Sequence, residues 1–216
     1  LADAGADNFE QRPIEGMYAA AAWTENGRPA TLPRDYYSSR FVVQKMIDYI
    51  EADRKSGKPF LASINFLANH IPVQAPGSDI ARYAAMYKDG WTALREARAK
   101  RAAALGIVPQ GAPMVAMATT PDWTKLDAEE RAAAVRVMQA YAGMATAMDR
   151  EIGRLVAHLK ATGDYGNTIF VFLSDNGAEP TNPYGSLRNR LFLRTQYDTS
   201  TANIGRRGSF SAIGPG

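Results

Sequence analysis

The chain has 216 residues, and its 46% hydrophobic and 22% charged side chains are the usual balance of a globular protein. The formal net charge is only +3 and no basic block carries interleaved aromatic residues, so nothing indicates a nucleic-acid partner. No apolar run reaches the roughly 18 residues of a membrane-spanning helix. Because there is no cysteine, disulfides, thiolate metal sites and cysteine nucleophiles are excluded from this chain.

The first part of the chain predicts a loop, a helix and a buried strand, in that order. Residues 1–35 lack a sustained period and predict a loop, with room for one short element near residues 17–23. A helix is expected to begin near Tyr37-Ser38-Ser39, whose hydroxyls can cap free amides, and to stop at Gly57. The nearly continuous apolar run 59–67 then predicts a buried strand.

The middle of the chain predicts two helices separated by a long loop. Apolar residues at helical spacing indicate a helix over residues 79–104, weakened at Gly90, and the proline-rich stretch 107–124 predicts a surface loop. The clearest helix covers residues 128–161, because a capping box precedes it and one apolar stripe runs along it to a glycine. Residues 178–203 are polar and predict a further loop.

A second strand is predicted at residues 168–173, a β-branched and aromatic run that ends in Asp175, Asn176 and Gly177. A further short strand is expected at residues 209–213. Strand, helix, helix and strand in this order predict a layered α/β domain, with a mainly parallel sheet flanked by helices. In such sheets ligands gather outside the carboxyl ends of the strands, where Asp175 and Asn176 stand.

Three polar residues are candidates for chemistry, and the residues alone leave each open. Asp175 and Asn176 offer hard oxygen ligands for Ca²⁺ or Mg²⁺, but Asp-Asn-Gly is also a common turn. His70 follows the first strand and precedes a proline-fixed loop, and it is either structural or functional. The other histidine, His158, lies off the apolar stripe of the long helix and is interpreted as a solvated side chain.

The chain resembles bacterial arylsulfatases, which are type I sulfatases of the alkaline phosphatase-like superfamily. The resemblance rests on segments whose order and approximate spacing match along nearly the whole chain. These are Leu32-Pro-Arg-Asp-Tyr-Tyr-Ser-Ser39, Lys58-Pro-Phe-Leu-Ala-Ser-Ile-Asn-Phe-Leu-Ala-Asn-His-Ile-Pro72, Gln74-Ala-Pro76, Tyr87-Lys-Asp-Gly-Trp-Thr-Ala-Leu-Arg95, Tyr141-Ala-Gly-Met144, Met148-Asp-Arg-Glu-Ile-Gly153, Leu173-Ser-Asp-Asn-Gly177 and Asn203-Ile-Gly-Arg-Arg-Gly-Ser-Phe210.

The resemblance implies a layered alkaline phosphatase-like fold and hydrolysis of small-molecule sulfate esters. It assigns Asp175 and Asn176 as ligands of a divalent cation, usually Ca²⁺ with Mg²⁺ as the other candidate, and it places a contact with the sulfate group on His70. In this family the nucleophile is a formylglycine hydrate made from Cys or Ser in a C/S-x-P-S-R motif. A cation beside cationic side chains then offsets charge on the sulfuryl oxygens.

The sequence also departs from the family pattern. It contains no C/S-x-P-S-R motif, no N-terminal Asp pair to complete the cation site, and no Lys and second His after a nucleophile segment. We therefore expect residues 1–216 to be the middle part of one sulfatase catalytic domain, without a second domain. A phosphonate or phosphate diester hydrolase of the same superfamily is the first alternative, and a fragment without catalysis of its own is the second. Localisation and oligomeric state stay open.

Overall fold

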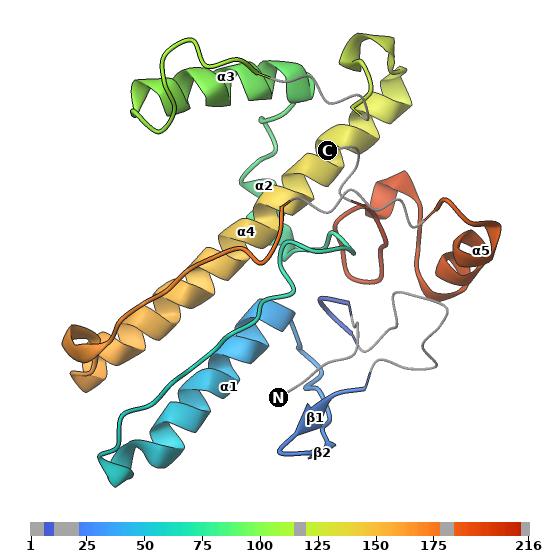
Figure 1. Ribbon diagram of the computed structural model, residues 1–216. Coiled ribbons are helices and arrows are strands. Elements are labelled where there is room, and N and C mark those ends of the chain that lie inside the picture. Colours follow the sequence, from blue (N-terminus) through green and yellow to red (C-terminus); the bar gives the residue numbers. More distant parts are fainter. Residues whose placement is uncertain (1–6, 11–21, 115–119, 178–183, 213–216) are drawn as a thin grey trace.

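A computed structural model describes residues 7–10, 22–114, 120–177 and 184–212 of the chain. The long helix α4 forms the axis of the molecule, with α1 beside its C-terminal half and α3 at its N-terminal end (Figure 1). The described elements are, in chain order, β1 (Thr24–Glu25), β2 (Arg28–Pro29), α1 (Ser38–Asp53), η1 (Arg54–Ser56), α2 (Gly77–Ala81), α3 (Gly90–Ala104), η2 (Trp123–Lys125), α4 (Ala128–Thr162), η3 (Tyr165–Asn167), α5 (Leu187–Gln196) and η4 (Thr201–Asn203), where η denotes a 3₁₀ turn.

Helix α4 begins and ends where the sequence predicts. The Asp127 carboxylate accepts a hydrogen bond from the Glu130 amide at 2.8 Å, and the Glu130 carboxylate accepts one from the Asp127 amide at 2.9 Å. This capping box satisfies two amides that lack partners in the first turn. At the other end Gly163 adopts φ 82°, a left-handed conformation that glycine reaches without steric cost and that ends the helix.

Helix α1 also confirms the prediction, but its N-terminus is not capped as expected. Tyr37 is the N-cap residue and makes no side-chain cap bond. The Ser38 hydroxyl instead donates to the buried amide oxygen of Asn8 at 2.6 Å. The predicted serine cap is therefore wrong, because a long-range partner takes the hydroxyl. Gly57, at φ 67°, follows η1 and ends the helical segment as predicted.

The helices pack through small residues around α4. Val73, Ala75, Ala140 and Met144 form a fully buried cluster between α4 and the chain that precedes α2. Gly205 lies so close to this cluster that a Cβ there would stand 2.6 Å from the Cβ of Ala140. The side chain of Arg154 bridges α4 to α1 by donating to the Gln44 side chain at 2.7 Å.

The predicted helix 79–104 is divided into two. Turns replace it over residues 82–89, and Tyr87 lies at φ 71° while Gly90 lies at φ 82°. Gly90 is required there because a Cβ would come within 2.2 Å of the Trp123 ring. The loop prediction for 107–124 holds for its described residues apart from the turn η2, and residues 115–119 lie outside the described part.

Residues 178–203 were expected to form a loop, and this is wrong for the part that the structure describes. Helix α5 occupies Leu187–Gln196, and the Ser186 hydroxyl accepts a hydrogen bond from the Asn189 amide at its start. Leu193 is fully buried with Tyr197 and Phe210, so packing stabilises a helix whose sequence is mostly polar. The short strand expected at 209–213 is reduced to an isolated bridge between Ser209 and Asp198, and residue 213 lies outside the described residues.

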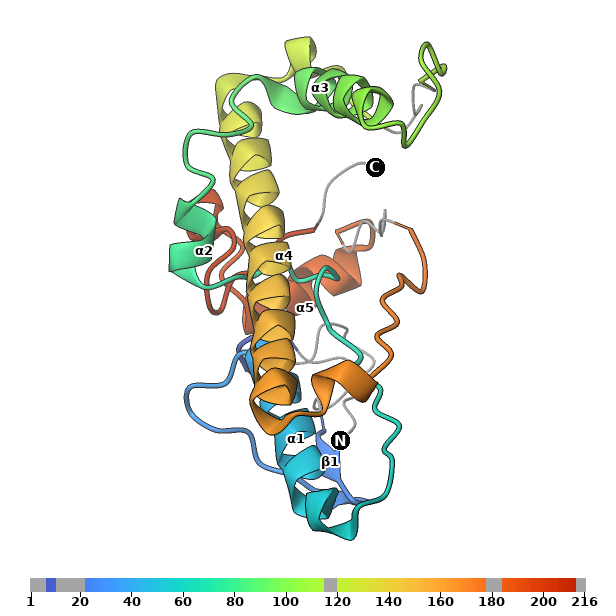
Figure 2. The ribbon, with the colours of Figure 1, turned by 90° about the vertical axis from the view of Figure 1, so that its left-hand side faces the viewer.

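The described residues contain one sheet, the antiparallel hairpin of β1 and β2. Its turn is Asn26-Gly27 with φ 53° and 73°, a type I′ arrangement that Asn-Gly favours. The predicted strands 59–67 and 168–173 are instead extended segments without ladder partners among the described residues. Both run away from the C-terminal ends of α1 and α4 (Figures 1 and 2). They expose apolar side chains, including Leu61 at 100% and Ile169 at 92%.

Among the helices in the described residues, none combines the length and hydropathy that crossing a bilayer requires.

Candidate functional site

His70 lies at the end of the first extended segment, in an exposed turn. Its Nδ1 atom is 2.8 Å from the carbonyl oxygen of Ile71. Because a carbonyl oxygen only accepts, the ring donates from Nδ1, and Nε2 is left for a ligand. The neighbouring Asn69 donates from its amide nitrogen to the carbonyl of Tyr141 on α4, at 3.3 Å. The turn that carries His70 is thus attached to the central helix.

The chain immediately after His70 is held in the core. Ile71, Val73 and Ala75 are buried, and the amides of Val73 and Ala75 donate to the carbonyls of Ser211 and Gly205 at 3.0 and 2.9 Å. These contacts anchor His70 on its C-terminal side.

Gln74 completes this anchor and was not recognised as important from the sequence. It is fully buried, it accepts from the Asn8 amide at 3.0 Å, and it donates to the Ser209 carbonyl at 2.7 Å. Three distant parts of the chain therefore meet at one side chain. The available signal was a glutamine inside the otherwise apolar stretch between His70 and Pro76, since a buried polar group requires hydrogen-bond partners.

Asp175 and Asn176 lie at the end of the second extended segment, and both side chains are exposed. The Asp175 Oδ1 atom accepts from the Asn176 amide at 3.0 Å, and the Asn176 side-chain nitrogen donates to the Gly177 carbonyl at 2.7 Å. Within the described residues nothing occupies Asp175 Oδ2 or Asn176 Oδ1. These two hard oxygens fit the preference of Ca²⁺ or Mg²⁺.

This pair supplies only part of a cation site. Ca²⁺ takes about six to eight oxygen ligands, and no group of three or more His, Cys, Asp and Glu side chains that could hold a metal occurs among the described residues. Among the described residues, no hydrogen bond joins His70 to Asp175 or Asn176. Each candidate thus lies at the far end of its own extended segment, where the end of a strand was predicted.

His158 is not the solvated side chain that the pattern suggested. Its Nε2 atom lies 3.1 Å from the Glu51 carboxylate of α1, and its side chain is only 23% exposed. The prediction failed because periodicity on one helix does not reveal the neighbouring helix that covers its polar face.

Comparison with known proteins places these residues in a family. The sulfatase family model matches residues 3–204. An arylsulfatase of Klebsiella aerogenes is 37% identical over 193 residues, which is 89% of this chain and 41% of that protein. An uncharacterized sulfatase of Schizosaccharomyces pombe is 35% identical and is matched over 84% of this chain and 33% of its own length.

A more distant relative has a broader description. A multifunctional alkaline phosphatase superfamily protein of Trinickia caryophylli is 27% identical over 176 residues, which is 76% of this chain and 32% of that protein. The chain therefore spans about a third to two fifths of the length of the curated relatives it matches. Since one family model covers almost all of it, and the segments that carry His70 and Asp175 lie inside that match, the chain belongs to the sulfatase family.

Proposed function

We propose that this chain is part of a longer sulfuric ester hydrolase, called the parent protein below. The parent protein acts on small-molecule sulfate esters and uses a divalent cation, with Ca²⁺ as the first candidate. The observation that carries the proposal is the family match over residues 3–204, which contains both segments with candidate site residues. The relative from Klebsiella aerogenes, which is named arylsulfatase and is 37% identical, supports sulfate as the substrate group.

Asp175 and Asn176 are the proposed cation ligands, through Oδ2 and Oδ1. Both atoms are exposed and unused among the described residues, so no existing contact has to break when a cation binds. The remaining ligands and the formylglycine nucleophile come from parts of the parent protein outside these 216 residues. When bound, the cation offsets negative charge on the sulfuryl oxygens.

His70 is the proposed sulfate contact. Its Nδ1 already donates to the Ile71 carbonyl, so only Nε2 is left to meet the substrate. Sulfate oxygens accept hydrogen bonds and do not donate them, so Nε2 must carry a proton to bind one. With both ring nitrogens donating, His70 makes this contact as an imidazolium.

Family membership implies the α/β fold of the alkaline phosphatase-like superfamily. We propose that residues 59–67 and 168–173 become strands of a mainly parallel sheet in the parent protein. The largely apolar composition of residues 59–67 and the β-branched and aromatic composition of residues 168–173 support this. Their exposure supports it too, since such runs are usually buried on both faces. The isolated chain is proposed to have no catalysis of its own, because it lacks a nucleophile and a full ligand set.

A phosphonate or phosphate diester hydrolase is the second candidate, supported by the relative from Trinickia caryophylli whose name includes the alkaline phosphatase superfamily. Parallel assays of the parent protein on an aryl sulfate and an aryl phosphodiester separate the two. We expect kcat/KM to favour the sulfate, and a clear preference for the diester would reject the first candidate. His70→Ala and Asp175→Ala should each lower kcat/KM by about a hundredfold or more, while Lys55→Ala, at an exposed residue away from the candidate site, should leave it within a few fold.

A further inference from the structure

Helix α5 (Leu187–Gln196) carries a concentrated positive charge. It contains three arginines and no acidic residue. The arginines are Arg188, Arg190 and Arg194, and all three are exposed. Asp198, just beyond the helix, offsets one of them, so residues 187–198 keep a net charge of +2, from three arginines less one aspartate. This charge belongs to the sequence of the helix itself.

Buried aromatic contacts within the chain hold α5 in place. Leu193 of the helix is fully buried. At the end of the helix the rings of Tyr197 and Phe210 lie 5.3 Å apart, and before its start the Tyr184 hydroxyl donates to the Phe210 carbonyl at 3.0 Å. Because Phe210 holds both ends, these contacts place the helix without any part of the parent protein outside the chain.

The cluster that holds α5 also contains the residue that follows His70. Its buried members are Ile71, Leu193, Tyr197 and Phe210. Figures 1 and 2 show α5 and the segment after it next to the turn at the end of the first extended segment. A basic helix therefore borders the turn that carries the proposed sulfate contact.

The helical repeat divides the arginines into two kinds. The packed face of α5 consists of the buried Leu193 and the partly buried Phe192 and Gln196. At about 100° per residue, Arg188 and Arg190 stand roughly 100° to either side of the middle of this face, whereas Arg194 stands roughly 150° away from it. Arg188 and Arg190 thus flank the face that packs beside the His70 turn, and Arg194 lies on the opposite side.

We propose that Arg188 and Arg190 form a second anion subsite beside His70, so that the preferred substrate is a sulfate ester that carries a further sulfate or carboxylate group. This deepens the proposed function and rests on it. A guanidinium presents its N–H donors in a planar fork that fits the oxygens of such groups. A sulfate ester without a second charge reaches His70 but gains nothing from α5.

The test compares two substrates of the parent protein, an aryl sulfate and the same aryl sulfate with two sulfonates on its ring. The double variant Arg188→Ala/Arg190→Ala should lower kcat/KM for the sulfonated substrate about fivefold more than for the plain one, the upper range for one exposed ion pair. Comparing each variant with the wild type on both substrates cancels the different reactivity of the two esters.

Two further variants make the comparison specific. Arg194→Ala removes the same charge from the opposite side of the helix and is the matched control, which should change the ratio of the two kcat/KM values by less than about twofold. Arg188→Lys/Arg190→Lys keeps the charge but loses the planar fork, so its ratio should fall between those of the wild type and the double alanine variant.

Binding gives a second readout that needs no turnover. Naphthalene trisulfonate and naphthalene monosulfonate contain no ester and so are not hydrolysed. Calorimetry of the parent protein should show tighter binding of the trisulfonate, and Arg188→Ala/Arg190→Ala should reduce that preference about fivefold. Added salt should weaken binding of the trisulfonate more than binding of the monosulfonate, because exposed charges are screened.

The results separate the subsite from the proposed function. The subsite is overturned if the wild type binds both sulfonates alike, if the double alanine variant lowers kcat/KM equally for both substrates, or if Arg194→Ala has the same effect as that variant. If the binding preference depends on Arg188 and Arg190 but no sulfate ester is hydrolysed, the proposed function fails and the subsite stands.

Discussion

Replacing Ile169 with lysine should have opposite consequences in the isolated chain and in the parent protein. Ile169 is 92% exposed in the isolated chain and lies in a run of exposed apolar residues. Such a run with unpaired backbone groups is a site for aggregation. A charge at this position should keep the isolated chain monomeric at higher concentration. In the parent protein the same position is proposed to lie in a buried strand.

The expected loss of stability differs widely between the isolated chain and the parent protein. Full burial of an isoleucine side chain stabilises by about 1.5–3 kcal/mol, so the 8% of Ile169 that is covered contributes at most about 0.2 kcal/mol in the isolated chain. In a buried strand the whole term is lost, and an unpaired buried ammonium adds several kcal/mol more. A total of at least about 4 kcal/mol corresponds to a fall in Tm of about 8–16 °C for a large domain.

Sedimentation velocity of the isolated chain and thermal melts of the parent protein measure the two effects. Leu105→Lys is the control, at an exposed apolar residue outside the two extended segments. It should change neither the association of the isolated chain nor the Tm of the parent protein. A parent protein whose Tm does not move with Ile169→Lys would refute the buried strand. A wild-type isolated chain that stays monomeric and melts sharply would refute the aggregation argument.

Three further results are expected. The isolated chain should show no micromolar Ca²⁺ site by calorimetry, and such a site, if Asp175→Ala removed it, would contradict the two-ligand count. Gly205→Ala should destabilise the parent protein by about 1–3 kcal/mol in urea unfolding, because the new Cβ meets α4 at 2.6 Å. Gly153→Ala is the control, since open space surrounds it, and it should be neutral or mildly stabilising. The pKa of Glu25 is lowered by hydrogen bonds, chiefly from Tyr49 and to a smaller extent from Lys45. The contribution of this carboxylate to stability is therefore present above about pH 4.5 and is lost as the pH falls further. Carboxyl NMR should show that Tyr49→Phe raises the pKa of Glu25.

The helices were predictable because their signals are local. The capping box before α4 and the glycines after α1 and α4 act within a few residues, and the structure confirms each. Helix α5 was missed because its sequence is polar and one buried leucine stabilises it through a distant phenylalanine. The Asn26-Gly27 hairpin did have a local signal, which was overlooked.

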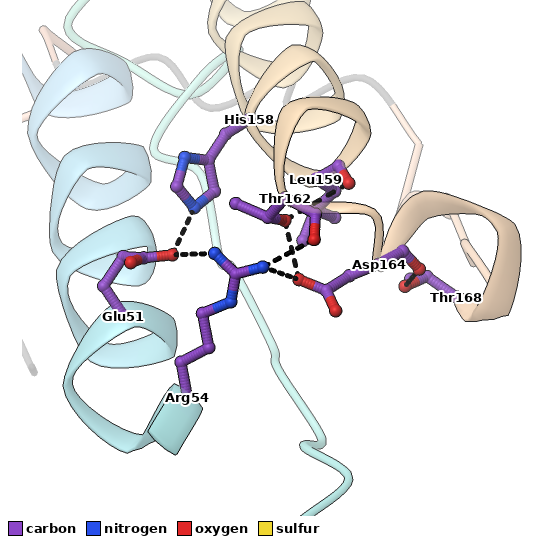
Figure 3. A network of polar contacts seen from close by, with 7 residues as sticks. All are labelled: Glu51, Arg54, His158, Leu159, Thr162, Asp164 and Thr168. Carbon is purple, nitrogen blue, oxygen red and sulfur yellow. Dashed lines mark hydrogen bonds and ion pairs between the residues drawn. The ribbon is translucent and has the colours of Figure 1, made fainter. Parts of the chain in front are cut away.

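The strands were harder to predict from the sequence than the helices. A strand needs a partner to supply its ladder, and residues 59–67 and 168–173 have none among the described residues, so composition alone could predict only an extended course. Asp175 and His70 were selected as candidates because each follows an apolar run, and their roles stay predictions. The contact between Arg54 and Asp164 (Figure 3) was not recognisable, because it joins residues 110 positions apart, and neither residue has a distinctive local pattern.

The buried side chain of Gln74 also bears on the order in which the molecule can form. One of its partners, Asn8, lies 66 residues earlier, while the other, the carbonyl of Ser209, lies 135 residues later. At about 5–20 residues per second, a ribosome needs roughly 7–27 s to add that later partner. Helices α1 and α4 can form in the meantime, since both end before residue 209 and their backbone hydrogen bonds are local. The turn that carries His70 reaches its final position only after residues 205–211 emerge, so it is fixed later than α1 and α4.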